Sequence, residues 1–470
     1  MRYFLAIIGG GPAGYTAAEK ASKAGKEVVL FEQNALGGTC LNVGCIPTKS
    51  LLYGAKQYYN ATHAQKYGVT AENVAFDYAA MQKRKTIVVR KLVAGIKQRL
   101  QNEHCTLVSG AATVLSYQPT AISIQCNGET YEAENLMICT GSTNFVPPIP
   151  GIKDNPHVWD STDALAATEL PGKIIIVGGG VIGMEFATLY HELGVEVTVI
   201  EAMPTILPNL DQEVVSILKE KYQKAGVKIL TSTKVERLEG NEVMVSQSNP
   251  NNLNTPSTLS ADKILVSVGR RANMQGLEAL TDLEMHRGGI VVDEFMKTNL
   301  PNVYACGDVT GKIMLAHVAS RQAEVCVGRM LRQIPLQRIA YNAVPSVVYT
   351  NPEIASVGLT EEQVRAFYTE MEGPAGLEKA GGVETFYEVR KLPMTFSGRF
   401  MAENDGETGL CKMLVDSKNK TVLGVHMIGN PCSEFVAAAS FAVRMGYTVS
   451  EMEQVIFPHP TVSEILHEVL

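Results

Sequence analysis

The chain has 470 residues, enough for about three domains, and its 46% hydrophobic and 19% charged residues are typical of an ordinary globular protein. The net charge of −7 comes without a basic patch, which argues against nucleic-acid binding, and no apolar run has the length of a membrane span. Nine irregularly spaced cysteines do not fit a secreted disulfide scaffold. Because the first predicted strand begins almost at Met1, we expect no signal peptide and a cytoplasmic protein.

The N-terminal segment predicts a dinucleotide-binding unit. A buried strand over 3–9 runs into a glycine-rich turn, followed by a helix over 15–24 and a second strand over 27–31 that ends at Glu32. In this context Gly9 makes the turn, Gly11 lets the backbone approach a pyrophosphate, and Gly14 permits close packing of helix and strand. Glu32 is placed to accept hydrogen bonds from a ribose.

Two cysteines, Cys40 and Cys45, follow in the stretch 37–50. No second Cys/His pair accompanies them, so the spacing does not indicate zinc. In an ideal helix they would be separated by about 7.5 Å of rise, so a disulfide would need a loop or a distorted helical turn, for which Gly44 provides the freedom. Taken alone, this spacing favours two unrelated buried thiols. Lys49 lies on the helical face of Cys45 and would favour its thiolate, although a solvated surface lysine is the alternative.

The next residues predict a long helical stretch over 52–104 and then short strands over 105–138. Thr140-Gly141-Ser142 closes the last strand, and the prolines at 147, 148 and 150 indicate a domain boundary.

A second dinucleotide-binding unit begins at Lys173. A strand over 174–177, the glycines Gly178, Gly180 and Gly183, a helix to about 193 and a strand ending at Glu201 repeat the first pattern. Two such units imply two nucleotide cofactors. The acid at 201, with no arginine in 202–204, favours NAD over NADP. Glu185 is interpreted either as an acid stabilised by the helix dipole or as a group facing the other cofactor.

The remaining chain adds two further candidate sites. Residues 248–259 predict a turn-rich surface loop, and 369–383 a solvated excursion within an α+β region that starts near 341. A strand ends at Gly307-Asp308, where the carboxylate would meet polyol hydroxyls or would be a plain turn aspartate. Near the end, the prolines beside His459 hold it rigidly, and Glu464 would orient it as a general base.

These motifs occur in one order: Gly-Gly-Thr-Cys-Leu-Asn-Val-Gly-Cys-Ile-Pro-Thr-Lys at 37–49, two glycine turns, Gly-Asp, and His-Pro…Glu. Together they resemble the pyridine-nucleotide–disulfide oxidoreductases over essentially the whole chain. The resemblance implies an α/β fold with two Rossmann-like dinucleotide-binding domains, for FAD and NAD, and a C-terminal α+β dimerisation domain. The expected bounds are 1–147 for the FAD domain with the cysteine pair, 148–268 for the NAD domain, 269–340 for a segment completing the FAD site, and 341–470 for dimerisation.

The resemblance also implies which residues contact the cofactors. For FAD they are Gly9, Gly11, Gly14, Glu32, Thr39, Lys49, Ala112, Thr140, Gly141, Ser142, Asp308, Met314, Leu315, Ala316 and His317. For NAD they are Gly178, Gly180, Val181, Ile182, Gly183, Glu201, Val235 and Gly269.

The catalytic roles implied by the resemblance form a relay in a homodimer. Cys40 would be the outer thiol that meets substrate, and Cys45 the inner thiol beside the flavin. Lys49 and Glu185 would pair near the flavin, and His459, backed by Glu464, would be the base supplied by the partner chain. Asn351 stands where relatives often carry histidine, which is expected to affect packing only.

Within the family, the residues flanking the cysteines and Glu201 resemble the branch that reoxidises dihydrolipoyl groups with NAD⁺. The expected partner is a lipoyl-carrying acyltransferase subunit or lipoyl carrier protein of a 2-oxoacid dehydrogenase or glycine cleavage complex. One alternative is a related NAD(P)H-dependent reductase acting on a small thiol or disulfide. Another, of a different class, is a non-catalytic structural subunit of a multienzyme complex.

Overall fold

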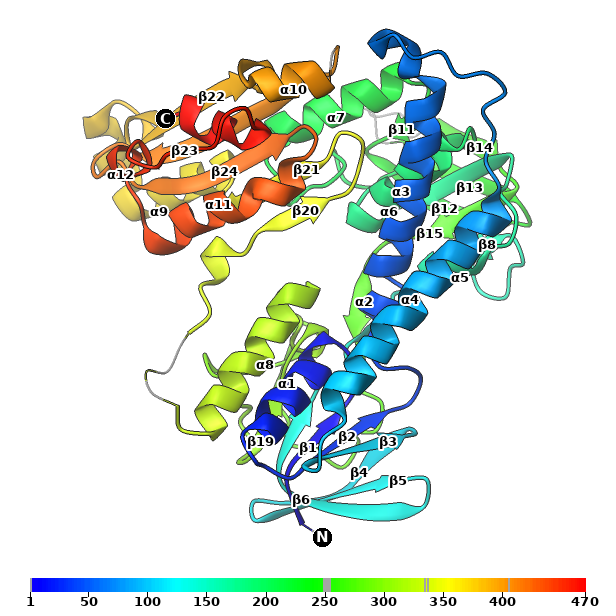
Figure 1. Ribbon diagram of the computed structural model, residues 1–470, viewed down its shortest axis with the longest axis vertical. Helices are drawn as coiled ribbons and strands as arrows, with labels where there is room; N and C mark the ends of the chain where they lie inside the picture. Colours follow the sequence, from blue (N-terminus) through cyan, green and yellow to red (C-terminus); the bar gives the residue numbers. More distant parts are fainter. Residues whose placement is uncertain (1, 248–254, 334, 336–337, 405) are drawn as a thin grey trace.

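The computed structural model describes residues 2–247, 255–333, 335, 338–404 and 406–470. Figure 1 shows two α/β units, connected by a pair of long helices, and a C-terminal unit. The α/β architecture predicted from the sequence is confirmed. Within the described parts, no helix combines the length and the hydropathy needed to cross a membrane.

The first unit is built on a sheet with strand order β3-β2-β1-β6-β5-β4, in which β19 also pairs with β6. Strands β1, β2, β3, β6 and β19 pair in parallel, with Ile7 opposite Leu30, whereas β4 and β5 form an antiparallel extension. Helices α1 and α8 lie side by side over this sheet, since alanines such as Ala17 and Ala323 allow close approach. The bounds are β1 Arg2–Ile8, β2 Val28–Glu32, β3 Cys105–Ser109, β4 Ala112–Gln118, β5 Ala121–Cys126, β6 Glu129–Ile138, β19 Val303–Ala305, α1 Pro12–Lys23 and α8 Ala316–Met330.

Two long helices connect the first unit to the second. Helix α3 (Cys45–Thr62) packs against α4 (Tyr78–Leu100) and, through Leu51, Leu52 and Ala55, shares a core with α6 of the second unit. The helical prediction over 52–104 is confirmed at 52–62 and 78–100 and is wrong at 68–77 and 101–104, where the chain is not helical. The first helix ends at Thr62, a short 3-10 helix η1 (Ala64–Tyr67) follows, and Asp77 caps the second by accepting a hydrogen bond from Ala80 N at 3.0 Å.

The second unit has a parallel sheet of order β11-β10-β9-β15-β8. An antiparallel sheet, β12-β13-β14, accompanies it. Two small ribbons complete this part of the chain: β7–β16, and β17–β18, which packs on the first unit because Ile290 belongs to that unit's core. The bounds are β7 Ser142–Asn144, β8 Val158–Trp159, β9 Lys173–Val177, β10 Glu196–Ile200, β11 Lys228–Leu230, β12 Thr233–Glu239, β13 Glu242–Gln247, β14 Thr255–Ser260, β15 Lys263–Val266, β16 Arg270–Ala272, β17 Met285–His286, β18 Gly289–Ile290, α5 Ser161–Ala166, α6 Val181–Glu192 and α7 Gln212–Lys224. Of the loop expected over 248–259, residues 248–254 lie outside the described residues, and the rest is strand β14.

The C-terminal unit is an antiparallel sheet of order β20-β21-β24-β23-β22 with helices around it. The bounds are β20 Ser346–Val348, β21 Ile354–Gly358, β22 Tyr387–Pro393, β23 Leu410–Asp416, β24 Val422–Ile428, α9 Glu361–Ala380, α10 Gly398–Glu403, α11 Cys432–Met445, α12 Val449–Met452 and α13 Ile465–Glu468, with 3-10 helices η3 Tyr341–Ala343, η4 Val383–Thr385, η5 Met394–Phe396 and η6 Val462–Glu464. A further 3-10 helix, η2 Asp308–Thr310, follows β19 in the first unit. The excursion expected over 369–383 is wrong for most of its length, because α9 continues to Ala380 with a kink at Gly373-Pro374.

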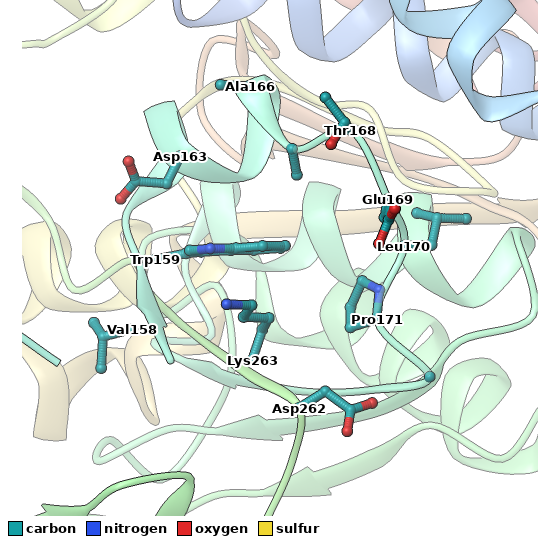
Figure 2. Close-up of a pocket in the computed structure, with 12 residues that line it drawn as sticks. Val158, Trp159, Asp163, Ala166, Thr168, Glu169, Leu170, Pro171, Asp262 and Lys263 are labelled. Atoms are coloured by element: carbon teal, nitrogen blue, oxygen red, sulfur yellow. The ribbon is translucent and has the colours of Figure 1, made fainter. Parts of the chain in front are cut away.

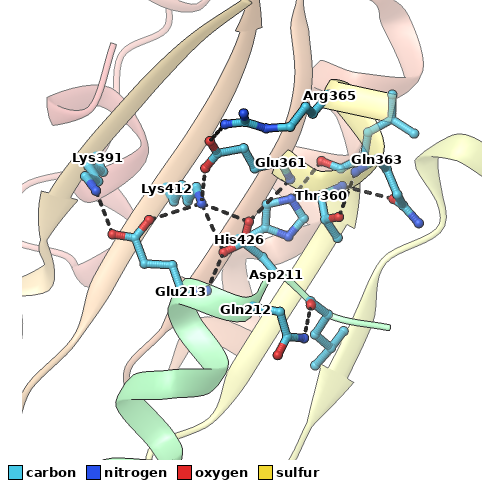
Figure 3. A network of polar contacts seen from close by, with 12 residues as sticks. Asp211, Gln212, Glu213, Thr360, Glu361, Gln363, Arg365, Lys391, Lys412 and His426 are labelled. Atoms are coloured by element: carbon cyan, nitrogen blue, oxygen red, sulfur yellow. Dashed lines mark hydrogen bonds and ion pairs between the residues drawn. The ribbon is translucent and has the colours of Figure 1, made fainter. Parts of the chain in front are cut away.

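A buried lysine ties the second unit to the C-terminal unit. Lys412 on β23 is 2% exposed, and its Nζ lies 3.0 Å from Asp211 Oδ2, 3.1 Å from Glu213 Oε2 and 2.7 Å from Glu361 Oε2 (Figure 3). Asp211 and Glu213 begin α7, whereas Glu361 begins α9. Buried charges persist only when paired, so this network fixes the two units against each other.

Candidate active site

The two cysteines stand on either side of a break between two helices. Cys40 lies in α2 (Gly38–Asn42), and Cys45 is the first residue of α3. Gly44 is required at the break, because a Cβ there would lie 2.8 Å from the carbonyl oxygen of Thr39. Thr48 stabilises the new helix, since its Oγ1 donates to Gly44 O at 2.7 Å. The chain thus has the distorted helical turn that a disulfide between these positions would require.

Both cysteines are thiols in the structure, and a hydrogen bond joins them. The Cys40 thiol donates to the Cys45 sulfur, which lowers the pKa of Cys45 to about 7 against the opposing effect of burial, and Lys49 lowers it further. The same hydrogen bond, with burial, raises the pKa of Cys40. Cys45 also stands at the N-terminus of α3, where a negative charge is favoured. The pair is therefore asymmetric, with Cys45 as the thiolate near neutral pH.

An ion pair lies next to the cysteines. Lys49 Nζ is 2.7 Å from Glu185 Oε2 and 2.9 Å from Oε1, and the glutamate is almost fully buried between α3 and α6. The contact is the Lys49–Glu185 pair that the family resemblance implied. Tyr349, which sequence reasoning missed, covers the pair: its ring centroid lies 4.6 Å from Lys49 Nζ.

The first glycine turn leaves open space where a phosphate is expected. A Cβ on Gly9 would lie 2.2 Å from the carbonyl oxygen of Cys139, and a Cβ on Gly14 would lie 1.8 Å from that of Gly9. At Gly11 the nearest atom to such a Cβ would be 3.8 Å away, on Gly38. The outer two glycines are thus needed for packing, and the middle one keeps the helix N-terminus accessible to a diphosphate.

The second turn repeats this arrangement. A Cβ on Gly178 would lie 2.5 Å from the carbonyl oxygen of Ser267, and one on Gly183 would lie 2.0 Å from that of Gly178. Nothing lies within 4 Å of a Cβ on Gly180. Both turns therefore fit a dinucleotide.

The two acids predicted to bind ribose, Glu32 at the end of β2 and Glu201 directly after β10, make the same kind of hydrogen bonds in both units. Glu32 accepts hydrogen bonds from Gly10 N and Asn34 N, each at 2.7 Å. Glu201 accepts from Gly179 N and Met203 N, each also at 2.7 Å. In each unit the carboxylate lies against the glycine turn, where the ribose next to a bound diphosphate is recognised.

The strand end at Gly307-Asp308 and the cysteine-bearing stretch 37–50 both reach the first glycine turn. Gly37 N donates to Gly10 O at 2.8 Å, and a Cβ on Gly38 would lie 2.7 Å from Gly11 Cα. A Cβ on Gly307 would lie 3.6 Å from the Cβ of Ala13 in α1. Segments far apart in the sequence thus meet around one helix N-terminus.

Asp308 belongs to a polar group that the sequence reasoning predicted only in part. Ser142 Oγ donates to Asp308 Oδ2 at 2.6 Å, and Arg270 Nε donates to Ser142 Oγ at 2.7 Å. Arg270 was missed, although its position directly after Gly269, at the end of a strand, was a usable signal. Thr140 and Gly141 lie beside this group and hydrogen-bond to Asn273.

The other predicted cofactor contacts lie around the two turns or in adjoining strands. Met314 and Leu315 precede α8, Ala316 and His317 begin it, Val181 and Ile182 begin α6, and Thr39 lies in α2. Burial lowers the pKa of His317, whose Nε2 lies 3.0 Å from Pro345 O. Ala112 and Val235 lie in β4 and β12, and Gly269 has a positive φ of 120°.

His459 and Glu464 form a pair at the end of the chain. His459 Nδ1 lies 2.8 Å from Glu464 Oε1, and Thr461 N donates to Glu464 Oε2 at 2.8 Å. The Thr461 hydrogen bond and the histidine lower the pKa of Glu464. In Figure 1 the C terminus lies in the C-terminal unit, apart from α2.

A separate cavity of about 730 Å³ lies in the second unit, with Trp159, Glu169 and Lys263 among its lining residues (Figure 2). It opens at the amino ends of β9 and β15. Because nucleotides bind at the carboxyl ends of parallel strands, this cavity is not the predicted NAD site.

Family models match nearly the whole chain. The model described as "Pyridine nucleotide-disulphide oxidoreductase" matches residues 3–323, and the model of that family's dimerisation domain matches residues 344–470, which indicates a homodimer.

Similar proteins are known along the full length. The dihydrolipoyl dehydrogenase of Mycoplasma pneumoniae is 37% identical, over 100% of this chain and 98% of that protein. The enzyme of the same name from Thermus scotoductus is 38% identical, over 99% and 96%. The copper(II) complex of the HOCl-induced flavoprotein disulfide reductase RclA of Escherichia coli has a TM-score of 0.83 at 29% identity, over 100% of this chain and 99% of that one. LpdA of Mycobacterium tuberculosis shares the fold, with a TM-score of 0.87 at 24% identity.

The family predicted from the motifs is thereby confirmed, and its members bind FAD and a pyridine nucleotide. With its paired cysteines and two nucleotide turns, the chain belongs to the pyridine nucleotide-disulphide oxidoreductase family and is a flavoprotein disulfide oxidoreductase.

Proposed function

We propose that the protein is a dihydrolipoyl dehydrogenase, which converts a protein-bound dihydrolipoyl group and NAD⁺ to lipoyl disulfide, NADH and a proton. The observation that carries the proposal is the asymmetric pair of Cys40 and Cys45 beside the Lys49–Glu185 ion pair. Full-length relatives of 34–38% identity that bear this name support the choice of substrate. Glu201, without an arginine nearby in 202–204, supports NAD as the nucleotide.

The residues present fit both cofactors. The first glycine turn, Glu32, Asp308 and the other residues predicted for FAD would hold the flavin nucleotide, and the second turn with Glu201 would hold NAD. When bound, FAD supplies the two-electron exchange between a dithiol and the nicotinamide.

The thiol chemistry begins from the Cys40–Cys45 disulfide. His459 of the second copy takes the proton of one substrate thiol, and the resulting thiolate attacks Cys40 Sγ. The Cys40–Cys45 bond breaks, and Cys45 leaves as a thiolate, which the positive charge of Lys49 favours. The second substrate thiol then loses its proton and attacks the substrate sulfur of the mixed disulfide. This releases the lipoyl disulfide and leaves Cys40 to take up one proton.

The dimer is essential to this proposal. Within one chain the C-terminal segment lies apart from α2, so the histidine would act on the cysteines of the other copy. Exposed apolar side chains of the C-terminal unit support a second copy as its partner, among them Phe441, Met445 and Ile456, which are 67%, 61% and 94% exposed. A lipoyl-carrying acyltransferase subunit or carrier protein would deliver the substrate, and the cytoplasmic location remains a prediction.

A steady-state comparison tests the proposal. The purified protein is given NAD⁺ with dihydrolipoamide, with reduced glutathione, or with no thiol, and NADH formation is followed. We expect dihydrolipoamide to support turnover at least about a hundredfold faster than glutathione, because only a cyclising dithiol resolves the mixed disulfide within one molecule. Equal rates would refute the proposed substrate.

A reductase of another disulfide is the second candidate. The likeness to RclA over the whole chain favours it, although the copper and HOCl response belong to that protein. The same assay in reverse, with NADH and a panel of small disulfides, separates the two. Faster reduction of a small disulfide than of lipoamide would favour the second candidate.

A further inference from the structure

One segment of the C-terminal unit holds α6 at two acidic residues. This segment consists of residues 349–351 and is called the 349–351 segment below. It directly follows β20, which reaches α6 in Figure 1. Tyr349 N donates to Glu185 Oε1 at 3.2 Å, and Asn351 Nδ2 donates to Glu192 Oε1 at 2.6 Å. The two glutamates lie two helical turns apart on one face, and both are buried. The segment therefore fixes α6 along its length, and Asn351 does more than pack.

The side chain of Tyr349 adds a contact to the redox site. Its ring centroid lies 4.6 Å from Lys49 Nζ, within the range of a cation–π interaction. The ammonium is thus held between the Glu185 carboxylate and an aromatic face. Both contacts restrict its position and reduce its access to water, so its charge acts through a medium of lower dielectric.

The charged groups that act on Cys45 come from three elements: Lys49 on α3, Glu185 on α6 and Arg270 on β16. The Cys40 thiol on α2 donates a hydrogen bond to Cys45, and Tyr349 also interacts with Cys45 electrostatically. Tyr349 contacts the first two of the charged groups and belongs to the unit that matches the dimerisation domain.

We propose that Tyr349 is a positioning residue for Cys45: from the C-terminal unit, its ring and its amide hold the Lys49–Glu185 pair in the place from which the pair stabilises the thiolate. The inference rests on the proposed function in one respect, that Cys45 reacts as a thiolate. It does not depend on the identity of the substrate.

The test compares Tyr349→Leu, which removes the ring and keeps the amide, with Tyr349→Phe, which keeps both. The hydroxyl has no hydrogen-bond partner among the described residues, so the phenylalanine variant preserves the contacts. The reduced full-length protein is alkylated with iodoacetamide from about pH 5 to about pH 9, a range that brackets thiol titration, and the peptides carrying Cys40 and Cys45 are quantified by mass spectrometry. No thiol substrate is present.

We expect Tyr349→Leu to raise the midpoint of Cys45 alkylation by about half a pH unit, which slows alkylation about twofold at about pH 7 and about threefold at about pH 5 to 6. Tyr349→Phe should retain the native profile. In a Lys49→Met background, Tyr349→Leu should add no shift, because the ring acts through the ammonium. Phe295→Leu is the matched control, since this half-buried ring lies over Arg329 at 5.3 Å and away from the cysteines.

The inference is overturned if Tyr349→Leu keeps the native pH profile of Cys45 alkylation. It is also overturned if Tyr349→Phe shifts that profile as much as Tyr349→Leu does. If Tyr349→Leu does not fold by circular dichroism, Tyr349→Met replaces it under the same criteria. A protein that gives the expected shifts but does not oxidise dihydrolipoamide refutes the proposed function and leaves this inference standing.

Discussion

The imidazole of His459 is oriented by Glu464, with Nδ1 2.8 Å from Oε1, yet its side chain is 79% exposed. A histidine that is both oriented and accessible suits proton transfer to a group from outside its own chain. We predict that His459→Gln lowers dihydrolipoamide turnover by about 10²–10⁴-fold, the usual contribution of a general base. Flavin absorbance checks that FAD binding is unchanged, and native turnover would remove this histidine from the mechanism.

A mixed dimer tests whether the base crosses between copies. His459→Gln and Cys40→Ser chains, each inactive alone, are co-expressed with different affinity tags. The purified heterodimer contains one site with both native residues, so we expect it to recover about half the activity of the native dimer. Recovery of none would indicate that the base and the cysteines work within a single chain.

The titration of Cys45 gives a pH prediction. Its pKa is lowered to about 7 by the hydrogen bond from Cys40 and by Lys49, whereas burial raises the pKa of Cys105 to about 11. Alkylation of Cys45 in the reduced protein should therefore rise through about pH 7, and Cys105 serves as the slow control. The ionisation of Cys45 also contributes to the free energy of unfolding of the reduced protein, because its pKa in the folded state lies below that of an unfolded thiol. This contribution is complete above about pH 8.5 and is lost as the pH falls through about 7. A midpoint at the ordinary thiol value would contradict the hydrogen-bonded pair.

The nucleotide preference depends on the charge of Glu201. Glu201→Gln keeps the size of the side chain and removes the charge that repels a 2′-phosphate. We expect the ratio of kcat/KM for NAD⁺ over NADP⁺ to fall about tenfold, equivalent to about 1.4 kcal/mol. Glu32→Gln is the matched control, since it makes the same change in the first unit and should weaken FAD retention without altering this ratio.

The buried Lys412 gives a stability prediction. Lys412→Met leaves Asp211, which is 0% exposed, without its cation, and the loss of one partner of a buried pair costs about 3–5 kcal/mol. Chemical denaturation of the native and variant proteins measures the difference. Lys391→Met, which removes a half-exposed partner of Glu213, should cost less than about 1 kcal/mol. Equal losses would mean that burial does not govern this network.

Local patterns in the sequence predicted the parts of the molecule that are themselves local. The glycine turns and the acids Glu32 and Glu201 lie within short strand–helix–strand units, so their spacing alone determines their geometry. The helix α9 was missed because Gly373-Pro374 is a signal of chain reversal, yet here these residues only kink a helix that its capping residue Thr360 and its buried face maintain.

Contacts between distant segments left no such signal. Tyr349 reaches Lys49 across 300 positions of sequence, and Arg270 reaches Ser142 only after the strands β7 and β16 have paired. Each depends on the arrangement of units already folded, which spacing does not encode.

The small ribbon β7–β16 has a mechanical consequence. Its two strands belong to chain segments on either side of the second unit, and Arg270 binds across it to the backbone oxygen of Ser142 at 2.8 Å. The backbone hydrogen bonds between the two strands oppose movement of one strand along the other. The ribbon therefore restricts relative motion at the junction of the two nucleotide-binding units. We therefore expect the two nucleotide-binding units to move as one rigid body, so that the distance between the two nucleotide sites stays fixed during turnover.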